Sequence, residues 1–243
     1  MKAGKDSKVE YEAVPKAPPF SQSTWLRPVV TPLGSHRLAG GSASFDLIDV
    51  VMMSQATGYV ASRMSCDQLI ASTDDRNLAS AALDRIVAAR PDFAGLHMDR
   101  IHLMGILNVT PDSFSDNGVN FSPATAILKG KSMWADGASI IDVGGESTRP
   151  GAAPVTCNQE LARILPPITG LNRDNIRISV DTRHAAVMTR ATAAGASIIN
   201  DVSGLQGDGA MAAAAASEAP VVIMHMQGTP ETMQQNPGYD FAP

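Results

Sequence analysis

The pattern of apolar and polar positions changes near residue 101. From there on, short apolar runs alternate with longer segments that have helical periodicity. The runs are rich in β-branched residues and apolar on both faces, which is typical of buried parallel strands. Five strands are predicted, at 101–108, 139–143, 176–181, 197–200 and 220–225.

Capping signals indicate where two of the intervening helices begin. Ser122 is followed by Pro123, which is a favourable N-cap with proline at the first helical position. Thr156, with Gln159 three residues later, has the spacing of a capping box. We therefore expect helices to start directly after Ser122 and Thr156.

A short internal repeat indicates a regular fold. The segment GASIIDV at 137–143 returns as GASIINDV at 195–202, and in both copies the leading glycine ends a helix before a strand begins. Repeated helix–strand units build either a (β/α)8 barrel or a doubly wound sheet. With five strands counted, the pattern predicts about five β/α units of such a fold.

The chain before residue 99 lacks this regular pattern. Residues 1–32 are rich in Pro, Ser and Lys and are predicted to form a flexible N-terminal tail. Residues 33–98 are predicted to form a small α+β extension. Residues 99–243 then hold the β/α units.

Within the extension, residues 45–53 are apolar enough for a strand and residues 74–90 have helical periodicity. Ser72 or Thr73 is the expected N-cap of that helix. No catalytic constellation is found in this region. Its charged residues are interpreted as solvated surface groups: Arg37, Asp46, Asp49 and Arg63.

Composition narrows the class of protein. The 243 residues are 44% hydrophobic and 18% charged, which is typical of a chain that buries a core. Aromatic residues make up only 5%, which suits helices packed on a parallel sheet better than an all-β sandwich. The net charge of −5 argues against general nucleic-acid binding, although a local basic pocket for an anionic small molecule remains compatible with it.

Targeting signals are not found. Cys66 and Cys157 form neither a metal motif nor a disulfide framework, so a reduced, cytoplasmic setting is expected. The polar start of the chain is not a signal peptide. No run of about 20 apolar residues is present, and we expect no membrane span.

Polar residues follow the predicted strands. In barrels and in open α/β sheets, sites form at the carboxyl ends of strands. Strand ends are often polar for other reasons, but five in succession, dominated by Asp and Asn, favour a site. The residues are Asn108, Asp142, Asp181, Asn200, Asp201 and His225.

Two loops carry candidate chemistry. The loop 108–116 offers an amide, two carboxylates and three hydroxyls, and hard oxygens of this kind suit Mg²⁺. A simple Asx or ST turn is the alternative interpretation. The loop 144–151 combines glycines with Thr148 and Arg149, which match a phosphate or pyrophosphate but form no Walker or dinucleotide pattern.

Asp181 and Asn200 suggest a third element of the site. A carboxylate accepts two adjacent N–H donors, and an amide pairs with a mixed donor–acceptor edge, so together they suit a flat nitrogen heterocycle. Met224 could offer a polarisable face to such a ring, although core packing is the simpler interpretation of this methionine.

These residues resemble the signatures of the dihydropteroate synthase family. The segment MGILNVTPDSFSD at 104–116 is similar to the first signature, and IIDVGGESTRPGA at 140–152 is similar to the second. Shorter matches follow at 178–182, 198–202 and 224–228. The resemblance covers residues 101–239 and implies a (β/α)8 TIM barrel.

The resemblance implies a transferase of folate biosynthesis. It would join 6-hydroxymethyl-7,8-dihydropterin pyrophosphate to para-aminobenzoate and release pyrophosphate, in an Mg²⁺-dependent reaction. It also implies small-molecule substrates and a homodimer of the full-length protein.

The family pattern also implies roles for individual residues. Asn108 would bind Mg²⁺, and Arg149 and Asp116 would be the catalytic residues. The substrate-binding set divides by ligand part: Thr148 and Arg149 for the pyrophosphate, Asp181, Asn200, Val202 and Met224 for the pterin, and Phe114, Asp116 and Pro150 for para-aminobenzoate.

The family continues through three more strands, so the resemblance implies that the 243 residues hold only the first five β/α units. We expect the 243 residues alone not to turn over. Two alternatives stay open: the pterin- or folate-binding domain of a methyltransferase, and a short pterin-binding protein without catalysis. The loops that carry Phe114 and Arg149 favour the synthase over the methyltransferase.

Overall fold

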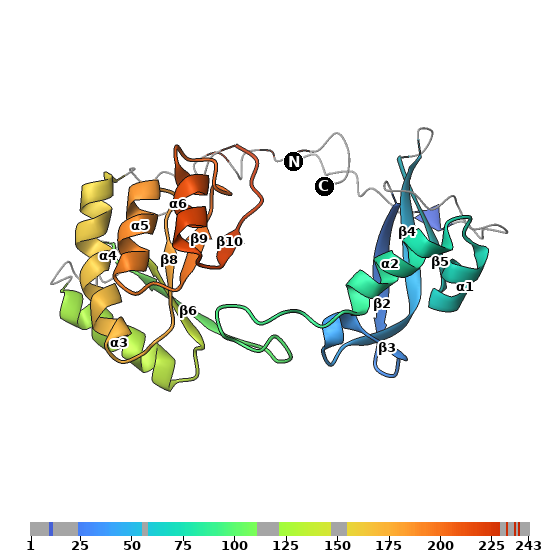
Figure 1. The fold of residues 1–243 in the computed structure, drawn as a ribbon, viewed down its shortest axis with the longest axis horizontal. Helices are drawn as coiled ribbons and strands as arrows, with labels where there is room; N and C mark the ends of the chain where they lie inside the picture. Colours follow the sequence, from blue (N-terminus) through green and yellow to red (C-terminus); the bar gives the residue numbers. More distant parts are fainter. Residues whose placement is uncertain are drawn as a thin grey trace. The chain divides into compact units, whose positions relative to one another are not determined.

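The computed structural model describes residues 10–11, 24–54, 58–110, 122–146, 155–228, 232, 236 and 238 (Figure 1). The chain forms two compact units. The first unit contains the described residues up to 92 together with residues 96–100, and the second contains residues 93–95 together with the described residues from 101 to 238.

The second unit contains a parallel five-stranded sheet. Four helices connect successive strands, and each strand pairs with the one before it, so the order is β10-β9-β8-β7-β6. In a doubly wound sheet, the order in which successive strands are added reverses at a switch point. The continuous order confirms the barrel alternative, here as five β/α units. The strands are β6 (Met104–Asn108), β7 (Ile140–Gly144), β8 (Ile178–Asp181), β9 (Ile198–Asp201) and β10 (Val221–Ile223).

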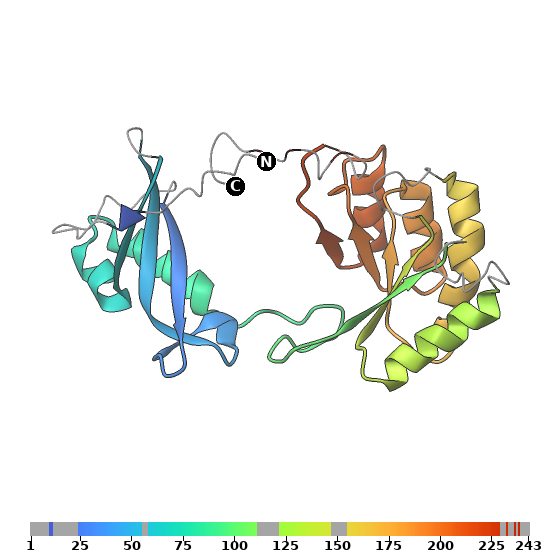
Figure 2. The same cartoon turned by 180° about the vertical axis from the view of Figure 1, so that it is seen from behind.

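The helices cover one face of this sheet (Figures 1 and 2). Successive side chains of β6 point alternately toward the helices and away from them, because Leu107 is fully buried while Ile106 is 63% exposed. The core lies between the helices and the outward-facing strand residues, among them Ile141, Val143 and Val180. The helices are α3 (Pro123–Ala135), α4 (Cys157–Asn172), α5 (Ala185–Ala193) and α6 (Ala210–Ser217).

The predicted capping signals of this unit are confirmed. The Ser122 side chain accepts a hydrogen bond from the Thr125 amide at 3.2 Å, and Pro123 is the first residue of α3. Thr156 and Gln159 form a reciprocal capping box at the start of α4. The repeated glycines, Gly137 and Gly195, take φ values of 108° and 117°, a region that other residues rarely adopt.

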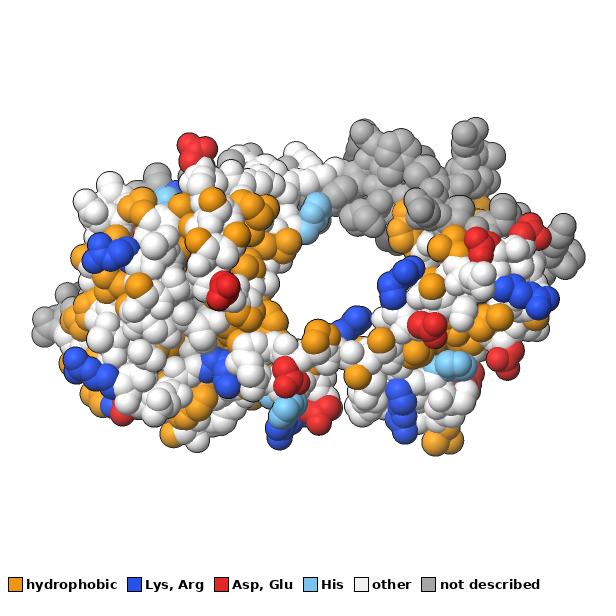
Figure 3. All heavy atoms as spheres, in the orientation of Figure 1, with side chains coloured by type: hydrophobic (Ala, Val, Ile, Leu, Met, Phe, Trp, Pro, Cys, Tyr) orange, Lys and Arg blue, Asp and Glu red, His pale blue; other side chains and the backbone are white. Residues whose placement is uncertain are grey.

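The surface of the second unit carries no large charged patch on the face shown in Figure 3, where Lys, Arg, Asp and Glu side chains lie scattered among other groups. Within the described ranges, none of the helices combines the length and apolarity that a membrane crossing requires.

The first unit is an α+β unit built on a mainly antiparallel sheet. Its strand order is β1-β5-β4-β2, and β3 also pairs with β4. The core of this unit contains Phe45, Ile48 and Val50 of the sheet and buried residues of the two α-helices. The strands are β1 (Glu10–Tyr11), β2 (Thr24–Thr31), β3 (His36–Arg37), β4 (Ser44–Ser54) and β5 (Gly58–Ser65), and the helices are η1 (Leu38–Gly40), α1 (Cys66–Ser72) and α2 (Arg76–Val87).

The predicted flexible tail at residues 1–32 is wrong for Glu10–Tyr11 and Thr24–Thr31, which form β1 and β2. Pro28 suggested an irregular chain, but β2 lies at the edge of the sheet, where a missing N–H is tolerated. The predicted cap of α2 is also wrong. Asp75, and not Ser72 or Thr73, accepts the hydrogen bond from the Leu78 amide.

Asp49 is not the solvated charge that the sequence suggested, because it is only 1% exposed. Arg27 and Arg63 flank it on the neighbouring strands, with ion-pair distances of 2.9 and 2.7 Å. The Arg63 hydrogen bond makes the largest contribution to holding the pKa of Asp49 below its ordinary value, against the opposing effect of burial.

Ile141 provides a test of the helix-facing core. Truncation to alanine (Ile141→Ala) removes a fully buried side chain, and we expect the free energy of unfolding to fall by about 2–4 kcal/mol. Ile101→Ala is the matched control, since Ile101 is 90% exposed, and should change stability by less than about 0.5 kcal/mol. Urea denaturation of both variants measures the difference. Equal effects would contradict the placement of Ile141 in the helix-facing core.

Candidate functional site

Register brings polar side chains from different strands into one row. Asn108 pairs with Gly144, Gly144 with Asp181, and Asp181 with Asn200. Residues that pair across a parallel sheet project to the same face. The row, here called the strand-end row, lies on the face without helices and consists of Asn108, Gly144, Asp181, Asn200 and Val222.

Gly144 leaves room at the centre of the strand-end row. A Cβ at this position would lie 3.3 Å from Asp181 Oδ2 and 3.4 Å from Asn108 Oδ1. The two side-chain oxygens therefore both lie close to Gly144, one from each neighbouring strand. Only glycine lets both approach without a closer contact than side chains ordinarily make.

A second row lies one layer deeper and contains Ile106, Asp142, Ser179 and Ile198. Asp142 is buried, and its Oδ2 accepts a 3.2 Å hydrogen bond from the Asn200 amide nitrogen. Burial raises the pKa of Asp142, and the nearby polar side chains of Ser179 and Asn200 offset this only in part. The expectation that Asp142 lies at a strand end is wrong, because β7 continues to Gly144.

Asp181 lies in a strongly acidic environment. Burial, followed by repulsion from Asp142, Glu160, Asp201 and Glu146, raises its pKa from 3.8 to about 7. Removing a carboxylate from water and surrounding it with like charges disfavours its ionised form. A ligand that presents N–H donors to Asp181 would relieve this cost.

The turn after β9 is shaped by Asp201. Its buried carboxylate accepts hydrogen bonds from the Ser203 amide at 2.7 Å and the Leu205 amide at 3.0 Å. Val202 lies half-buried in this turn. Met224 lies next to the start of this turn, because the Met224 amide donates to the Asp201 carbonyl at 3.4 Å. The Met224 side chain is 40% exposed, so it is not part of the closed core.

The structure thus brings Asn108, Asp181 and Asn200 together in one row and joins Met224 to Asp201, the residue that precedes Val202. The remaining predicted site residues lie outside the described residues: Phe114, Asp116, Thr148, Arg149 and Pro150.

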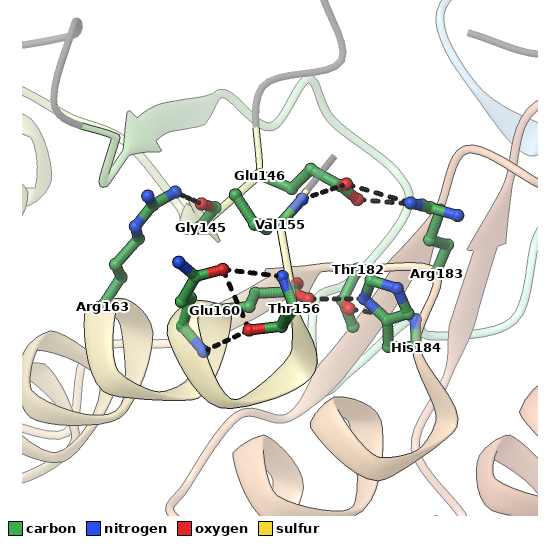
Figure 4. Close-up of polar contacts among 10 residues, drawn as sticks. Gly145, Glu146, Val155, Thr156, Glu160, Arg163, Thr182, Arg183 and His184 are labelled. Atoms are coloured by element: carbon green, nitrogen blue, oxygen red, sulfur yellow. Dashed lines mark hydrogen bonds and ion pairs between the residues drawn. The ribbon is translucent and has the colours of Figure 1, made fainter. Parts of the chain in front are cut away.

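A polar cluster that the sequence did not indicate lies behind the ends of β7 and β8 (Figure 4). Arg183 donates to Glu146 through Nε and Nη2, at 2.8 and 3.0 Å. His184 Nδ1 lies 2.7 Å from the Oε2 of the fully buried Glu160. Each pair joins residues that are far apart in sequence, and only their position next to strand ends could have pointed to them.

Fold and site together define the second unit as an α/β-barrel unit with a candidate site at the carboxyl ends of its strands. The family described as pterin binding enzymes matches residues 104–241, which is more than half of the chain. The chain therefore belongs to the pterin binding enzyme family.

Individual relatives are dihydropteroate synthases. The dihydropteroate synthase of Escherichia coli (strain K12) is 50% identical over 146 residues, covering 60% of this chain and 52% of that protein. The crystal structure of the Yersinia pestis enzyme with a sulfonamide drug complex has 49% identity, a TM-score of 0.57, and coverage of 62% and 56%. The Xanthomonas albilineans enzyme with 4-aminobenzoic acid has 45% identity, a TM-score of 0.55, and coverage of 61% and 54%. The chain spans about half the length of the curated relatives it matches.

The raised pKa of Asp181 predicts a pH-dependent cost to stability. Because the folded-state pKa is about 7 and the ordinary value is 3.8, the folded protein holds this proton more tightly. Stability then decreases as the pH rises from 3.8 to 7. We expect Asp181→Asn to have a higher free energy of unfolding than the wild type at pH 8, by on the order of 1–4 kcal/mol. Urea denaturation at pH 5 and pH 8 should show this gain shrinking at the lower pH, and a gain independent of pH would contradict the assignment.

Proposed function

We propose that this chain carries the pterin-binding part of a dihydropteroate synthase. The enzyme would condense 6-hydroxymethyl-7,8-dihydropterin pyrophosphate with para-aminobenzoate to give 7,8-dihydropteroate and pyrophosphate. The observation that carries the proposal is the strand-end row, in which Asn108, Asp181 and Asn200 share one face of the sheet. The family membership and the names of the relatives support the same reaction.

Asp181 and Asn200 bind the pterin ring in this proposal. Ionised Asp181 accepts two adjacent N–H donors of the ring, which relieves its repulsion from the neighbouring carboxylates. Asn200 is oriented by Asp142, because a carboxylate accepts from the amide nitrogen and leaves the amide oxygen for another partner. Val202 and Met224 pack against the flat ring.

Asn108 fits a role as a ligand of Mg²⁺. Its Oδ1 lies at the strand-end row over Gly144, and amide oxygens are hard ligands. Mg²⁺ commonly takes only one or two oxygens from protein and completes its shell with phosphate and water. When bound, the ion would neutralise charge on the departing pyrophosphate. Thr148 and Arg149 would contact the same group through a hydroxyl and a planar guanidinium.

Phe114, Asp116 and Pro150 form the para-aminobenzoate site in this proposal, and Arg149 and Asp116 take part in catalysis. The relative from Xanthomonas albilineans, whose structure contains 4-aminobenzoic acid, supports this ligand class. Departure of pyrophosphate before attack by the aromatic amine leaves an electron-poor pterin, so a strong general base is not required. We further propose a cytoplasmic homodimer that acts on small molecules and not on nucleic acid or membranes.

Pyrophosphate release tests the reaction. The protein that contains this chain at its full natural length should release pyrophosphate from the dihydropterin substrate only when para-aminobenzoate is added, and chelation of Mg²⁺ should abolish release. A methyltransferase would bind the pterin without releasing pyrophosphate. Binding without release would therefore reject the synthase and favour one of the two alternatives, the methyltransferase domain or the pterin-binding protein without catalysis.

Gly144 offers a second test, within the site. Gly144→Ala places a methyl group between Asn108 Oδ1 and Asp181 Oδ2, and we expect the KM for the dihydropterin substrate to rise about tenfold, with a smaller change for para-aminobenzoate. Gly41→Ala is the control, because Gly41 has a negative φ and its Cβ would meet nothing closer than 3.4 Å. Steady-state kinetics on both variants provides the comparison. An unchanged KM in Gly144→Ala would contradict the proposed pterin position.

A further inference from the structure

Arg183 holds Glu146 in a two-point ion pair, here called the clasp (Figure 4). Glu146 follows β7, and Arg183 follows β8. The fork geometry matches a guanidinium to a carboxylate and fixes orientation as well as distance. The Glu146 side chain is 12% exposed and the Arg183 side chain 38%, so the pair is better shielded from water than an ordinary surface pair.

Glu146 also joins two parts of the chain that are separated in sequence. Its Oε1 accepts a hydrogen bond from the Val155 amide at 3.3 Å, which links residues nine positions apart in the sequence. Arg163 of α4 donates to the Gly145 carbonyl at 2.7 Å. The chain therefore leaves β7 and enters α4 at points that are held together by side chains.

Gly145 allows this close approach. A Cβ there would lie 2.8 Å from Ile164 Cγ2 and 3.0 Å from Glu160 Cγ, so only glycine lets the backbone rest on α4. Thr156, which directly follows Val155, is the N-cap of α4, and the helix begins at Cys157.

The segment after β8 is tied to the same helix. His184 Nδ1 lies 2.7 Å from Glu160 Oε2, and the His184 amide donates to the Thr182 hydroxyl at 3.2 Å. Residues 182–184 thus contact α4 through His184 and the end of β7 through Arg183. Asp181 immediately precedes this tied segment.

The electrostatics of the clasp favour an ionised Glu146. Burial by itself would raise the pKa of Glu146, but the hydrogen bonds from Arg183 and Val155 outweigh it, and the pKa lies below its ordinary value. The charge that the fork requires is therefore present at neutral pH.

We propose that Glu146 and Arg183 are positioning residues for the reaction described above. They fix the distance between the chain leaving β7 and the strand end that carries Asp181, and so set where the pyrophosphate group lies relative to the bound pterin. This inference rests on the proposed function. It assigns the clasp no contact with substrate. Because the clasp sets the place of the pyrophosphate group, its effect should depend on whether the ligand carries the pyrophosphate.

A pair of ligands separates positioning from a general structural role. In the natural-length protein, affinity is measured for the pterin pyrophosphate and for the matching 6-hydroxymethylpterin without pyrophosphate. We expect Glu146→Gln and Arg183→Gln each to weaken binding of the pyrophosphate ester about tenfold, while binding of the alcohol changes less than about twofold. Glu146→Gln keeps an acceptor for the Val155 amide, so it tests the ion pair and not that hydrogen bond.

The double variant and a conservative variant sharpen the test. Glu146→Gln combined with Arg183→Gln should be no weaker than the worse single variant, because both remove the same pair. Arg183→Lys keeps the charge but loses the fork and should recover only part of the affinity. Lys131→Gln is the control, since Lys131 forms an exposed pair with Asp174 at 2.6 Å, and it should leave both affinities unchanged.

Equal losses for both ligands would overturn the inference, because they would indicate a structural defect. Additive losses in the double variant, or no loss in either single variant, would overturn it as well. A wild-type protein that binds the alcohol but releases no pyrophosphate with para-aminobenzoate would instead reject the proposed function, which separates the two failures.

Discussion

Parallel pairing in register is the constraint on which this site depends. Asn108, Asp181 and Asn200 come from strands that are separated by whole helices, yet each occupies the same level of the sheet. A shift of one residue in any strand would move its polar side chain to the helix-covered face, where it would be buried without partners. The apolar core on that face, with Leu107, Val143 and Val180, therefore holds the polar row in place on the other.

The site is built at a cost to stability. Asp142 is buried beneath the strand-end row, and its hydrogen bond with Asn200 orients that amide while its charge acts on Asp181. The raised pKa of Asp181 expresses this repulsion. In the proposed function, a flat ring with adjacent N–H donors would complete the hydrogen bonding of Asp181 and Asn200. The carboxylates that raise the pKa of Asp181 would then favour binding of such a ring.

The residues that directly follow β7 and β8 are held by contacts with the start of α4 and with each other. The N-terminus of α4 is the common point, since Val155, Glu160 and Arg163 each contact residues that follow β7 or β8. Gly145 lets the backbone lie close enough for these contacts. In the other unit, Asp49 is held between two arginines in a comparable way, which shows how readily a buried carboxylate is stabilised when the fork geometry is available.

Local chemistry in the sequence determined the helix starts at Ser122 and Thr156 and the stops at Gly137 and Gly195, because each of these depends on residues within one turn of chain. The alternation of apolar runs with helical segments determined the succession of β/α units along the chain. Adjacent strands then had to place Asp181 and Asn200 near each other. The sequence could not place Asp142, since the layer of a residue depends on where its strand ends. It also misjudged Thr24–Thr31, because Pro28 is acceptable only on an edge, and whether a strand is at an edge is decided by its neighbours. Glu146 and Arg183 are 37 residues apart, and their contact exists only because β7 and β8 pair side by side. Pairing over such distances follows from packing of the whole sheet, and so the tertiary structure alone decided it.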